Sequence, residues 1–492
     1  PETRSGALPR WWPLAALTLL AAALRLGTLG HQSLWYDEAF TPVHVLRSSL
    51  ASTMHNVVHS ENTPPLWYVL EWAITRGLGT GAVALRLLSA VAGIATVPVA
   101  WAIGRELQGP DTRRAAIATA AFVAANPLLV WYSQEARAYG LFVFTASLAF
   151  LCFLRALSDP SSRGLLEFAA AASLALLSHY FAVFLLLPMG AWLLWASIPG
   201  KVLRVLCALA LPAVVGIALI PLIAAQGGHG TQWIGEWALA SRLEAIPQYY
   251  LTGYTGSALG HGVELLVALA IGAGVVYGLW CTLTPREERG ATIALVVSAC
   301  GVLIPIVLAL LGADYLAPRN LVAAMVPLSA LLAIVIVARR TGRTGALLAG
   351  LAAFAFLALT VDVNLSPRLQ RGDWAGVARV LEGGTGARAI TTVELGAAPL
   401  EYYLPGLANL ARGGEVKVSE VDETGYAPLR ASAKSPPAPG FRLSESRDIH
   451  GLVVYRFTST VPVTIPERVL REHVITLAHP EVLVPVSPGK TT

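Results

Sequence analysis

The chain has 492 residues, of which 55% are hydrophobic and only 13% are charged, and its mean hydropathy is +0.61. A soluble domain carries about 25% charged residues, so this composition excludes a soluble globular protein, a disordered chain and, despite the net charge of +5, a nucleic-acid-binding protein. The charge is concentrated in residues 365–492, which hold 14 Lys/Arg and 13 Asp/Glu. We therefore expect a membrane-embedded domain over residues 1–364 and a water-exposed domain over residues 365–492.

Eleven stretches of the first domain are apolar and long enough to cross a bilayer, which takes about 20 helical residues. They cover residues 11–29, 83–104, 113–131, 139–157, 164–178, 180–198, 202–225, 262–283, 291–311, 319–338 and 344–361. With a cytoplasmic N-terminus, 14 of the 21 Lys/Arg of this domain fall in inner loops, as the positive-inside rule requires. The odd number of spans then places the C-terminal domain outside the cytoplasm. Because only four of the 35 basic residues are Lys, a bias typical of high-GC bacteria, we expect a multi-pass protein of the bacterial inner membrane.

The first outer loop, residues 30–82, contains two apolar segments that we expect to lie as helices in the outer interface. Residues 64–78 would form about 22 Å of helix at 1.5 Å per residue, short of a roughly 30 Å hydrocarbon core, and they contain Glu71 and Arg76. A second helix is expected to begin at Thr41-Pro42, a favourable N-cap and first-turn pair. Its apolar face would comprise Val43, Leu46, Leu50, Met54 and Val57.

Two adjacent acids, Asp37 and Glu38, follow the first span in the sequence LWYDEAFT at residues 34–41. Carboxylates that are partly desolvated by aromatic and apolar neighbours can have raised pKa values and can act as general bases. The same pair could instead be solvated loop acids, or acids at a helix N-terminus that interact with the helix dipole.

A second polar group has the sequence SQEARAY and lies at residues 133–139, at the outer end of the third span. An acid and an arginine at membrane depth are costly unless they are paired or functional. Glu135 and Arg137 could be an ion pair that closes a tight turn. Alternatively, Glu135 would hold a metal ion or a sugar hydroxyl, and Arg137 would bind a phosphate.

Further polar residues are expected on the same outer face. His179 and Tyr180 occupy a turn in which the histidine could touch a phosphate or an acceptor, or could simply be hydrogen-bonded. Arg319 could either snorkel to the interface or bind a lipid phosphate. The aromatic loop 226–261 could form an interfacial belt or a sugar platform. Nucleotide-binding motifs such as GxxxxGK[ST] are absent, and an enzyme acting outside the cytoplasm lacks nucleotide sugars, so a lipid-linked donor would suit this architecture.

These motifs resemble those of the GT-C superfamily of polyprenyl-phosphate-sugar-dependent glycosyltransferases, in particular the branch of bacterial protein O-mannosyltransferases and the aminoarabinose transferase of lipid A. Four elements carry the resemblance in order within residues 11–361: WYDE at 35–38, TPPLWY at 63–68, SQEARAY at 133–139, and Tyr315 with Pro318-Arg319. The resemblance implies a polytopic α-helical membrane protein of GT-C type, with about 11 transmembrane helices and a C-terminal extracytoplasmic α/β domain. In that domain we expect a helix opening at Asp373, a strand near 387–393 and a helix near 397–404. One departure is that relatives often have His before the Pro-Pro, whereas Glu61-Asn62-Thr63 precede it here.

By this resemblance Asp37 would be the catalytic base, Glu38 would bind the acceptor or shape the site, and Glu135 and Arg137 would form the second-loop acidic and basic pair. The chain would transfer a sugar, with inversion, from a polyprenyl phosphate to a hydroxyl of a glycan, lipid or protein. Arg137 and Arg319 would bind the donor phosphate, and Glu135, Tyr139, His179 and Tyr180 would lie around the sugar or acceptor.

We expect no obligatory cofactor or metal, because the two carboxylates Asp37 and Glu135 are few ligands for Mg²⁺ or Mn²⁺. The four cysteines also lack metal-ligand spacing. A flippase of lipid-linked glycans, or another polytopic carrier, is the alternative function. It would need polar residues through the middle of the bilayer or on both faces, whereas this chain concentrates them on one face.

Overall fold

The computed structural model describes residues 11–109, 113–197, 199–228, 231–256, 260–384, 387–477 and 479–486. The chain forms two compact units. The first unit comprises Pro1–Leu29 and Arg47–Leu369, and the second comprises Gly30–Leu46 and Gln370–Thr492. The structure therefore groups the segment that carries Asp37 and Glu38 with the C-terminal residues, which the sequence did not indicate. The division at residue 364 into membrane-embedded and water-exposed parts stays a prediction.

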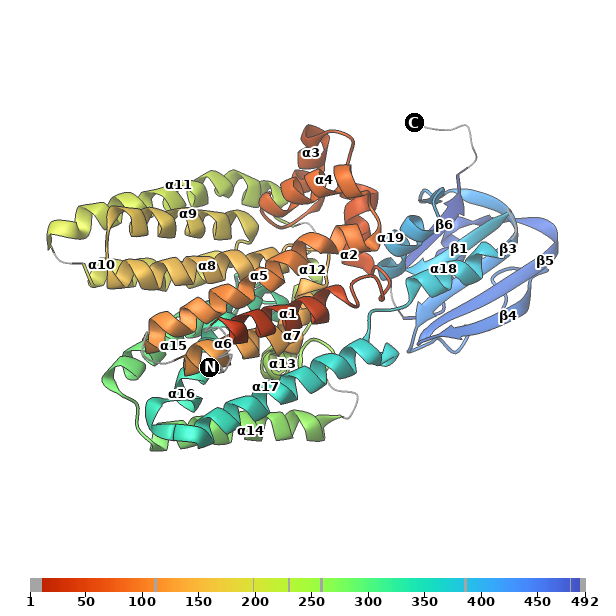
Figure 1. Ribbon diagram of the computed structural model, residues 1–492. Coiled ribbons are helices and arrows are strands. Elements are labelled where there is room, and N and C mark those ends of the chain that lie inside the picture. Colours follow the sequence, from red (N-terminus) through yellow and green to blue (C-terminus); the bar gives the residue numbers. More distant parts are fainter. Residues whose placement is uncertain are drawn as a thin grey trace, which may run out of the picture. The chain divides into compact units, whose positions relative to one another are not determined.

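The described part of the first unit is helical throughout (Figure 1). Its α-helices are α1 (Trp12–Leu26), α3 (Leu50–Ser60), α4 (Leu66–Leu78), α5 (Ala82–Gln108), α6 (Arg114–Ala125), α7 (Pro127–Ser133), α8 (Tyr139–Ser158), α9 (Ser162–Ser178), α10 (Ala182–Trp195), α11 (Val202–Gln226), α12 (Gln232–Glu236), α13 (Leu239–Thr252), α14 (His261–Trp280), α15 (Pro285–Leu310), α16 (Met325–Ile336) and α17 (Gly342–Leu365). Its 3₁₀ turns are η2 (Pro199–Lys201), η3 (Pro318–Ala324), η4 (Arg339–Thr341) and η5 (Pro367–Leu369).

Each of the eleven predicted apolar stretches coincides with helix in the structure. Among the described residues, seven helices are long and apolar enough to cross a membrane, or eight if the bent pair α6–α7 is one span. The apolar helices α1 and α10 are shorter than a full span. The chain is thus a multi-span helical membrane protein, and the number of eleven spans and their orientation stay predictions.

The 57° bend between α6 and α7 results from the Asn126-Pro127 pair. A residue before proline is disfavoured in the α conformation, and Asn126 is extended, with φ −61° and ψ 125°. Its side chain accepts a hydrogen bond from the Leu129 N–H at 3.1 Å and donates to the Tyr250 carbonyl at 3.2 Å. This cap starts α7 in a new direction, so that residues 133–139, which connect α7 to α8, lie at the end of the bundle.

The prediction of a helix beginning at Thr41-Pro42 is wrong. Residues Thr41–Val45 form a single π-helical turn (η1), Leu46 is extended, and α3 begins only at Leu50. Ser49 provides the cap, because its hydroxyl accepts from the Ser52 N–H at 3.0 Å, a standard N-cap contact. The other helix predicted for this loop, over residues 64–78, is present as α4.

The second unit is built on a six-stranded sheet in the order β2-β6-β1-β3-β5-β4. Only β1 and β3 pair in parallel, and the other neighbours are antiparallel. The strands are β1 (Arg388–Val393), β2 (Leu407–Asn409), β3 (Glu415–Tyr426), β4 (Arg442–Ile449), β5 (Leu452–Pro466) and β6 (Pro480–Pro485). The helices are α2 (Tyr36–Phe40), α18 (Trp374–Glu382), α19 (Glu394–Tyr403) and α20 (Glu467–Glu472), together with η1 (Thr41–Val45). The α/β character of residues 365–492 and the helix opening at Asp373 are confirmed.

Two apolar clusters cover the two faces of this sheet. Ile390 of β1 packs with residues of α18 and α19, whereas its neighbour Ala389 packs with Leu470 of α20 and Ile475. Successive residues of a strand point to opposite faces, so the sheet is buried on both sides at β1, whereas the edge strand β4 is largely exposed.

Residues 30–46 are attached to this unit by specific polar contacts. The Ser33 hydroxyl donates to the Asp373 carboxylate at 2.8 Å, and the Leu34 N–H donates to the Tyr403 hydroxyl at 2.8 Å. Glu38 lies 3.7 Å from Arg371 in an ion pair whose side chains are 0% and 3% exposed. Removing one partner of a buried ion pair leaves an uncompensated charge, so this pair fixes α2 in its place.

We predict that Arg371→Leu destabilises the packing of residues 30–46 by about 3–5 kcal/mol, because Glu38 would stay buried without its cation. The double variant Glu38→Gln/Arg371→Leu should recover part of this loss, because it removes both charges. Amide hydrogen exchange of residues 30–46 in the purified protein measures the effect. Equal protection in the wild type and the Arg371→Leu variant would contradict the structural role of the pair.

Candidate functional site

The predicted site residues fall in both compact units. Asp37 and Glu38 belong to the second unit, and Glu135, Arg137, Tyr139, His179, Tyr180 and Arg319 belong to the first. Asp37 is half-buried in the first turn of α2, next to the buried Glu38. The catalytic roles of Asp37 and Glu38 stay predictions, and the structure shows the Glu38 carboxylate paired with Arg371.

In the first unit, the turn that carries Glu135 and Arg137 is held against α1. The Arg25 side chain donates to the Ser133 hydroxyl at 3.1 Å and to the Ala124 carbonyl at 3.0 Å. The Gln134 amide donates to the Thr28 hydroxyl at 2.6 Å. Gly93 permits this approach, because a Cβ there would collide with the Ser133 hydroxyl. Arg25 and Gln134 therefore position the turn, a role that the sequence did not reveal.

Arg137 forms a bidentate ion pair with Glu61, with Nη–Oε distances of 3.0 and 2.9 Å. The two side chains are 11% and 4% exposed, and planar fork-to-carboxylate contacts of this kind are among the strongest and most directional in proteins. The turn itself is closed by the Arg137 N–H, which donates to the Glu135 carbonyl at 2.8 Å. Glu61 lies two residues before the TPPLWY motif, and the structure gives this acid a defined partner.

The segment that carries Glu61 is itself fixed by Tyr180 and Gln226. The Tyr180 hydroxyl donates to the Gln226 side-chain oxygen at 2.7 Å, and the Gln226 amide donates to the carbonyls of Val57 and Thr63 at 3.0 and 3.1 Å. Tyr180, predicted to contact sugar or acceptor, thus supports the backbone on either side of Glu61.

His179 is buried beside both arginines of the candidate site. Its ring stacks on Phe142, with centroids 4.6 Å apart, and lies 5.7 Å from the Tyr139 ring. Burial, reinforced by the positive charges of Arg137 and Arg319, lowers the pKa of His179 to about 3. The Phe181 N–H donates to Nδ1, so the imidazole is neutral and its proton is on Nε2. His179 can therefore donate one neutral hydrogen bond, but it adds no positive charge to the site.

Arg319 is the second residue of the 3₁₀ turn η3 and stacks on an aromatic side chain. Its guanidinium lies 4.7 Å from the centroid of the Trp233 ring, a favourable cation–π distance. Two further aromatic pairs involve the segment 226–261 and α7. Trp131 stacks on Tyr254 at a centroid distance of 5.4 Å, and Tyr254 meets Tyr249 edge-on at 5.4 Å. Aromatic residues of the loop 226–261 therefore pack beside the candidate site.

Tyr132 adds a hydrogen-bonding group that the sequence did not single out. Its ring contacts the Tyr139 ring at a centroid distance of 4.9 Å. Within the described part of the chain, its buried hydroxyl has no hydrogen-bond partner. A buried hydroxyl without a partner carries a desolvation cost, which a polar ligand group would relieve.

The described residues contain no cluster of three or more His, Cys, Asp or Glu side chains that could hold a metal ion. Asp37 and Glu135, the two carboxylates considered for Mg²⁺ or Mn²⁺, belong to different units. Whether a metal takes part stays a prediction.

Comparison with known proteins identifies a family segment and a fold. Residues 62–224 match the model of the dolichyl-phosphate-mannose-protein mannosyltransferase family, a segment that runs from the start of the TPPLWY motif into α11. No curated protein matches the chain. The crystal structure of ArnT from Cupriavidus metallidurans bound to undecaprenyl phosphate matches with a TM-score of 0.57 and 13% identity, over 91% of this chain and 98% of that chain.

Two other solved structures give lower scores. The archaeal oligosaccharyltransferase AglB from Archaeoglobus fulgidus, in complex with an inhibitory peptide and a dolichol-phosphate, has a TM-score of 0.44 and 13% identity, over 80% of this chain and 59% of that one. The S. cerevisiae protein O-mannosyltransferase Pmt1-Pmt2 complex bound to the sugar donor has a TM-score of 0.36 and 19% identity, over 44% of this chain and 34% of that one. The predicted resemblance to the GT-C glycosyltransferases is confirmed: the chain has the fold of ArnT, and its residues 62–224 match the dolichyl-phosphate-mannose-protein mannosyltransferase family.

Proposed function

We propose that the chain is a membrane glycosyltransferase that moves a sugar from a polyprenyl-phosphate donor to an acceptor hydroxyl on the extracytoplasmic face, with inversion at the sugar C1. The observation that carries this proposal is the Arg137 guanidinium, held by Glu61 at one end of a helical bundle, with His179 and Arg319 close to it. The family match of residues 62–224 and the ArnT fold support the same reaction class.

Two arginines near each other suit the phosphate of a lipid-linked donor. A guanidinium has five N–H donors and a bidentate carboxylate uses two of them, so the pairing with Glu61 is compatible with a phosphate contact by Arg137. Arg319, stacked on Trp233, would supply the second charge. As the bond between C1 and the phosphate oxygen breaks, these donors would stabilise the growing negative charge of the leaving prenyl phosphate.

The remaining polar groups would bind the sugar or the acceptor. Neutral His179 and the Tyr132 hydroxyl can each donate a hydrogen bond without adding charge, and Tyr139 presents a ring between them. Aromatic rings with neutral donors are well suited to a sugar, which has both apolar faces and hydroxyl edges. Glu135 would accept from a hydroxyl of the sugar or acceptor.

Asp37 would act as the catalytic base. It would take the proton of the acceptor hydroxyl while the acceptor oxygen forms its bond to C1 and the phosphate departs. The pair Glu38–Arg371, 3.7 Å apart and buried, would hold the short helix α2 and so keep Asp37 in one place. The assignment rests on the resemblance of the WYDE motif and on the half-buried environment of Asp37.

We predict that Asp37→Asn lowers sugar transfer by about 10²–10⁴-fold, the usual contribution of base catalysis, while expression and thermal stability stay normal. The measurement is transfer or release of labelled sugar from polyprenyl-phosphate sugars by purified protein. Asp159→Asn, an exposed acid of another loop, is the matched control and should transfer at the wild-type rate. Near-wild-type transfer by Asp37→Asn would refute the base, and lipid movement without sugar transfer by the wild type would identify a flippase.

We predict that Arg137→Ala raises the KM for the donor far more than that for the acceptor. Glu61→Gln should also raise the KM for the donor selectively, by up to about 10²-fold. Without the Glu61 carboxylate the Arg137 guanidinium would be misplaced, and a displacement of about 1 Å can have an effect of this size. If Glu61 acts only through Arg137, the double variant should be no worse than Arg137→Ala alone. A larger effect on the acceptor KM, or additive losses in the double variant, would refute this arrangement.

We also predict that transfer does not depend on a divalent metal. Treating the purified protein with EDTA, followed by removal of the chelator, should leave the rate unchanged. Loss of activity that returns on addition of Mg²⁺ or Mn²⁺ would show instead that carboxylates such as Asp37 or Glu135 hold an essential cation.

A further inference from the structure

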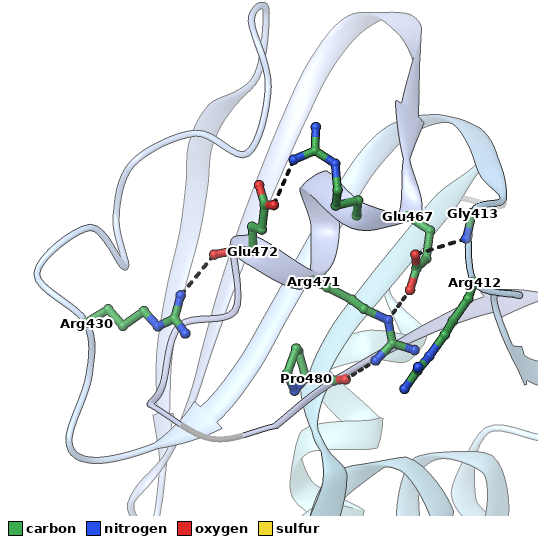
Figure 2. A pocket seen from close by; sticks show the side chains of 8 residues that line it. Arg412, Gly413, Arg430, Glu467, Arg471, Glu472 and Pro480 are labelled. Atoms are coloured by element: carbon green, nitrogen blue, oxygen red, sulfur yellow. Dashed lines mark hydrogen bonds and ion pairs between the residues drawn. The ribbon is translucent and has the colours of Figure 1, made fainter.

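The second unit contains a pocket of about 640 Å³ that takes no part in the reaction proposed above. Figure 2 shows its lining, which comes from α20, from Pro480 at the start of β6, and from the segments that precede and follow β3. The charged lining residues are four arginines and two glutamates, namely Arg412, Arg430, Arg468, Arg471, Glu467 and Glu472. The lining therefore has two more arginines than glutamates.

Two of the arginines are matched to the two glutamates. Arg471 pairs with Glu467, donates to the Pro480 carbonyl and also lies 3.3 Å from the Glu481 carboxylate, just outside the lining. Arg468 pairs with Glu472 at 2.9 Å. The hydrogen bond from Arg471, together with the Gly413 N–H and the charge of Arg412, lowers the pKa of Glu467 and keeps this carboxylate ionised. Arg468 and Arg471 therefore each have a carboxylate that compensates their charge.

The other two arginines account for the excess of arginines over glutamates. Within the described part of the chain, Arg412 has no hydrogen bond or ion pair, and no dashed line reaches it in Figure 2. Arg430 donates through Nη1 to the Glu472 carbonyl at 2.9 Å, but its Nε is buried without a partner among the described residues. In the view of Figure 2 these two side chains lie on either side of Arg471. The pocket thus holds two guanidiniums without carboxylate partners, one of them with a buried, unsatisfied donor.

We infer that this pocket binds a phosphate monoester, carried either by a saccharide or by a lipid headgroup. Guanidinium forks bind phosphate oxygens in pairs, and the two guanidiniums without a carboxylate partner, Arg412 and Arg430, would each have a phosphate oxygen to bind. A volume of about 640 Å³ lies within the range of small-ligand pockets, roughly 300–1,000 Å³, and leaves room for a sugar or glycerol unit attached to the phosphate. A ligand oxygen would also satisfy the buried Nε of Arg430.

The test is calorimetric titration of the full chain in a neutral detergent at low ionic strength. The Arg137→Ala background is used throughout, so that binding at the proposed donor site does not contribute. The probes are glucose 1-phosphate, with glucose as its neutral control, and dihexanoyl phosphatidic acid, with dihexanoyl phosphatidylcholine as its control. We expect saturable binding of at least one of the two phosphate monoesters, with a Kd at least tenfold higher in Arg412→Gln/Arg430→Gln.

The two probes distinguish the source of the phosphate. Binding of glucose 1-phosphate assigns the pocket to a phosphorylated saccharide, and binding of the short-chain phosphatidic acid alone assigns it to a lipid headgroup. Arg442→Gln, an exposed arginine of β4 outside the pocket, should leave the Kd unchanged. Absence of saturable binding by both probes, or equal affinity in the double variant, would overturn the inference. This readout is independent of sugar transfer, so failure here would leave the proposed function standing.

Discussion

A charged guanidinium can be kept in an apolar helical bundle only if a partner compensates its desolvation, and for Arg137 this partner is Glu61. The ion pair joins residues that are 76 positions apart. It therefore ties the segment before α4 to the turn between α7 and α8. Because both oxygens of Glu61 meet the guanidinium edge, the pair fixes the plane of Arg137 as well as its position.

Two sets of contacts in the first unit position the two partners of this ion pair. The bend at Asn126-Pro127 and the contacts of Arg25 and Gln134 place the turn that carries Arg137. Tyr180 and Gln226 place the backbone on either side of Glu61. Both sets consist of buried or half-buried polar groups that have hydrogen-bond partners, and such networks make a local structure rigid and specific. Because charged residues are scarce in this unit, these few polar contacts set the positions of the residues in the candidate site.

Much of the fold and part of the candidate site could be predicted from the sequence. Long apolar runs predicted helix at all eleven positions, because a helix satisfies its backbone hydrogen bonds within the segment. The proximity of His179 to Arg137 and Arg319 was implied by a shared outer face and is present in the structure. The partners Glu61 and Arg371 could not be found, because ion pairs between residues far apart in the sequence depend on tertiary packing. The start of α3 was misplaced for a local reason, since Ser49 is a better cap than Thr41 in its actual backbone conformation.

We propose that Arg137, oriented by Glu61, binds the phosphate of a prenyl lipid. The most direct measurement is the equilibrium binding of polyprenyl phosphate, without sugar, to purified wild type, Arg137→Ala and Glu61→Gln. We expect at least tenfold weaker binding in both variants, because each removes or misorients the same charge-assisted contact. Wild-type affinity in both variants would contradict it.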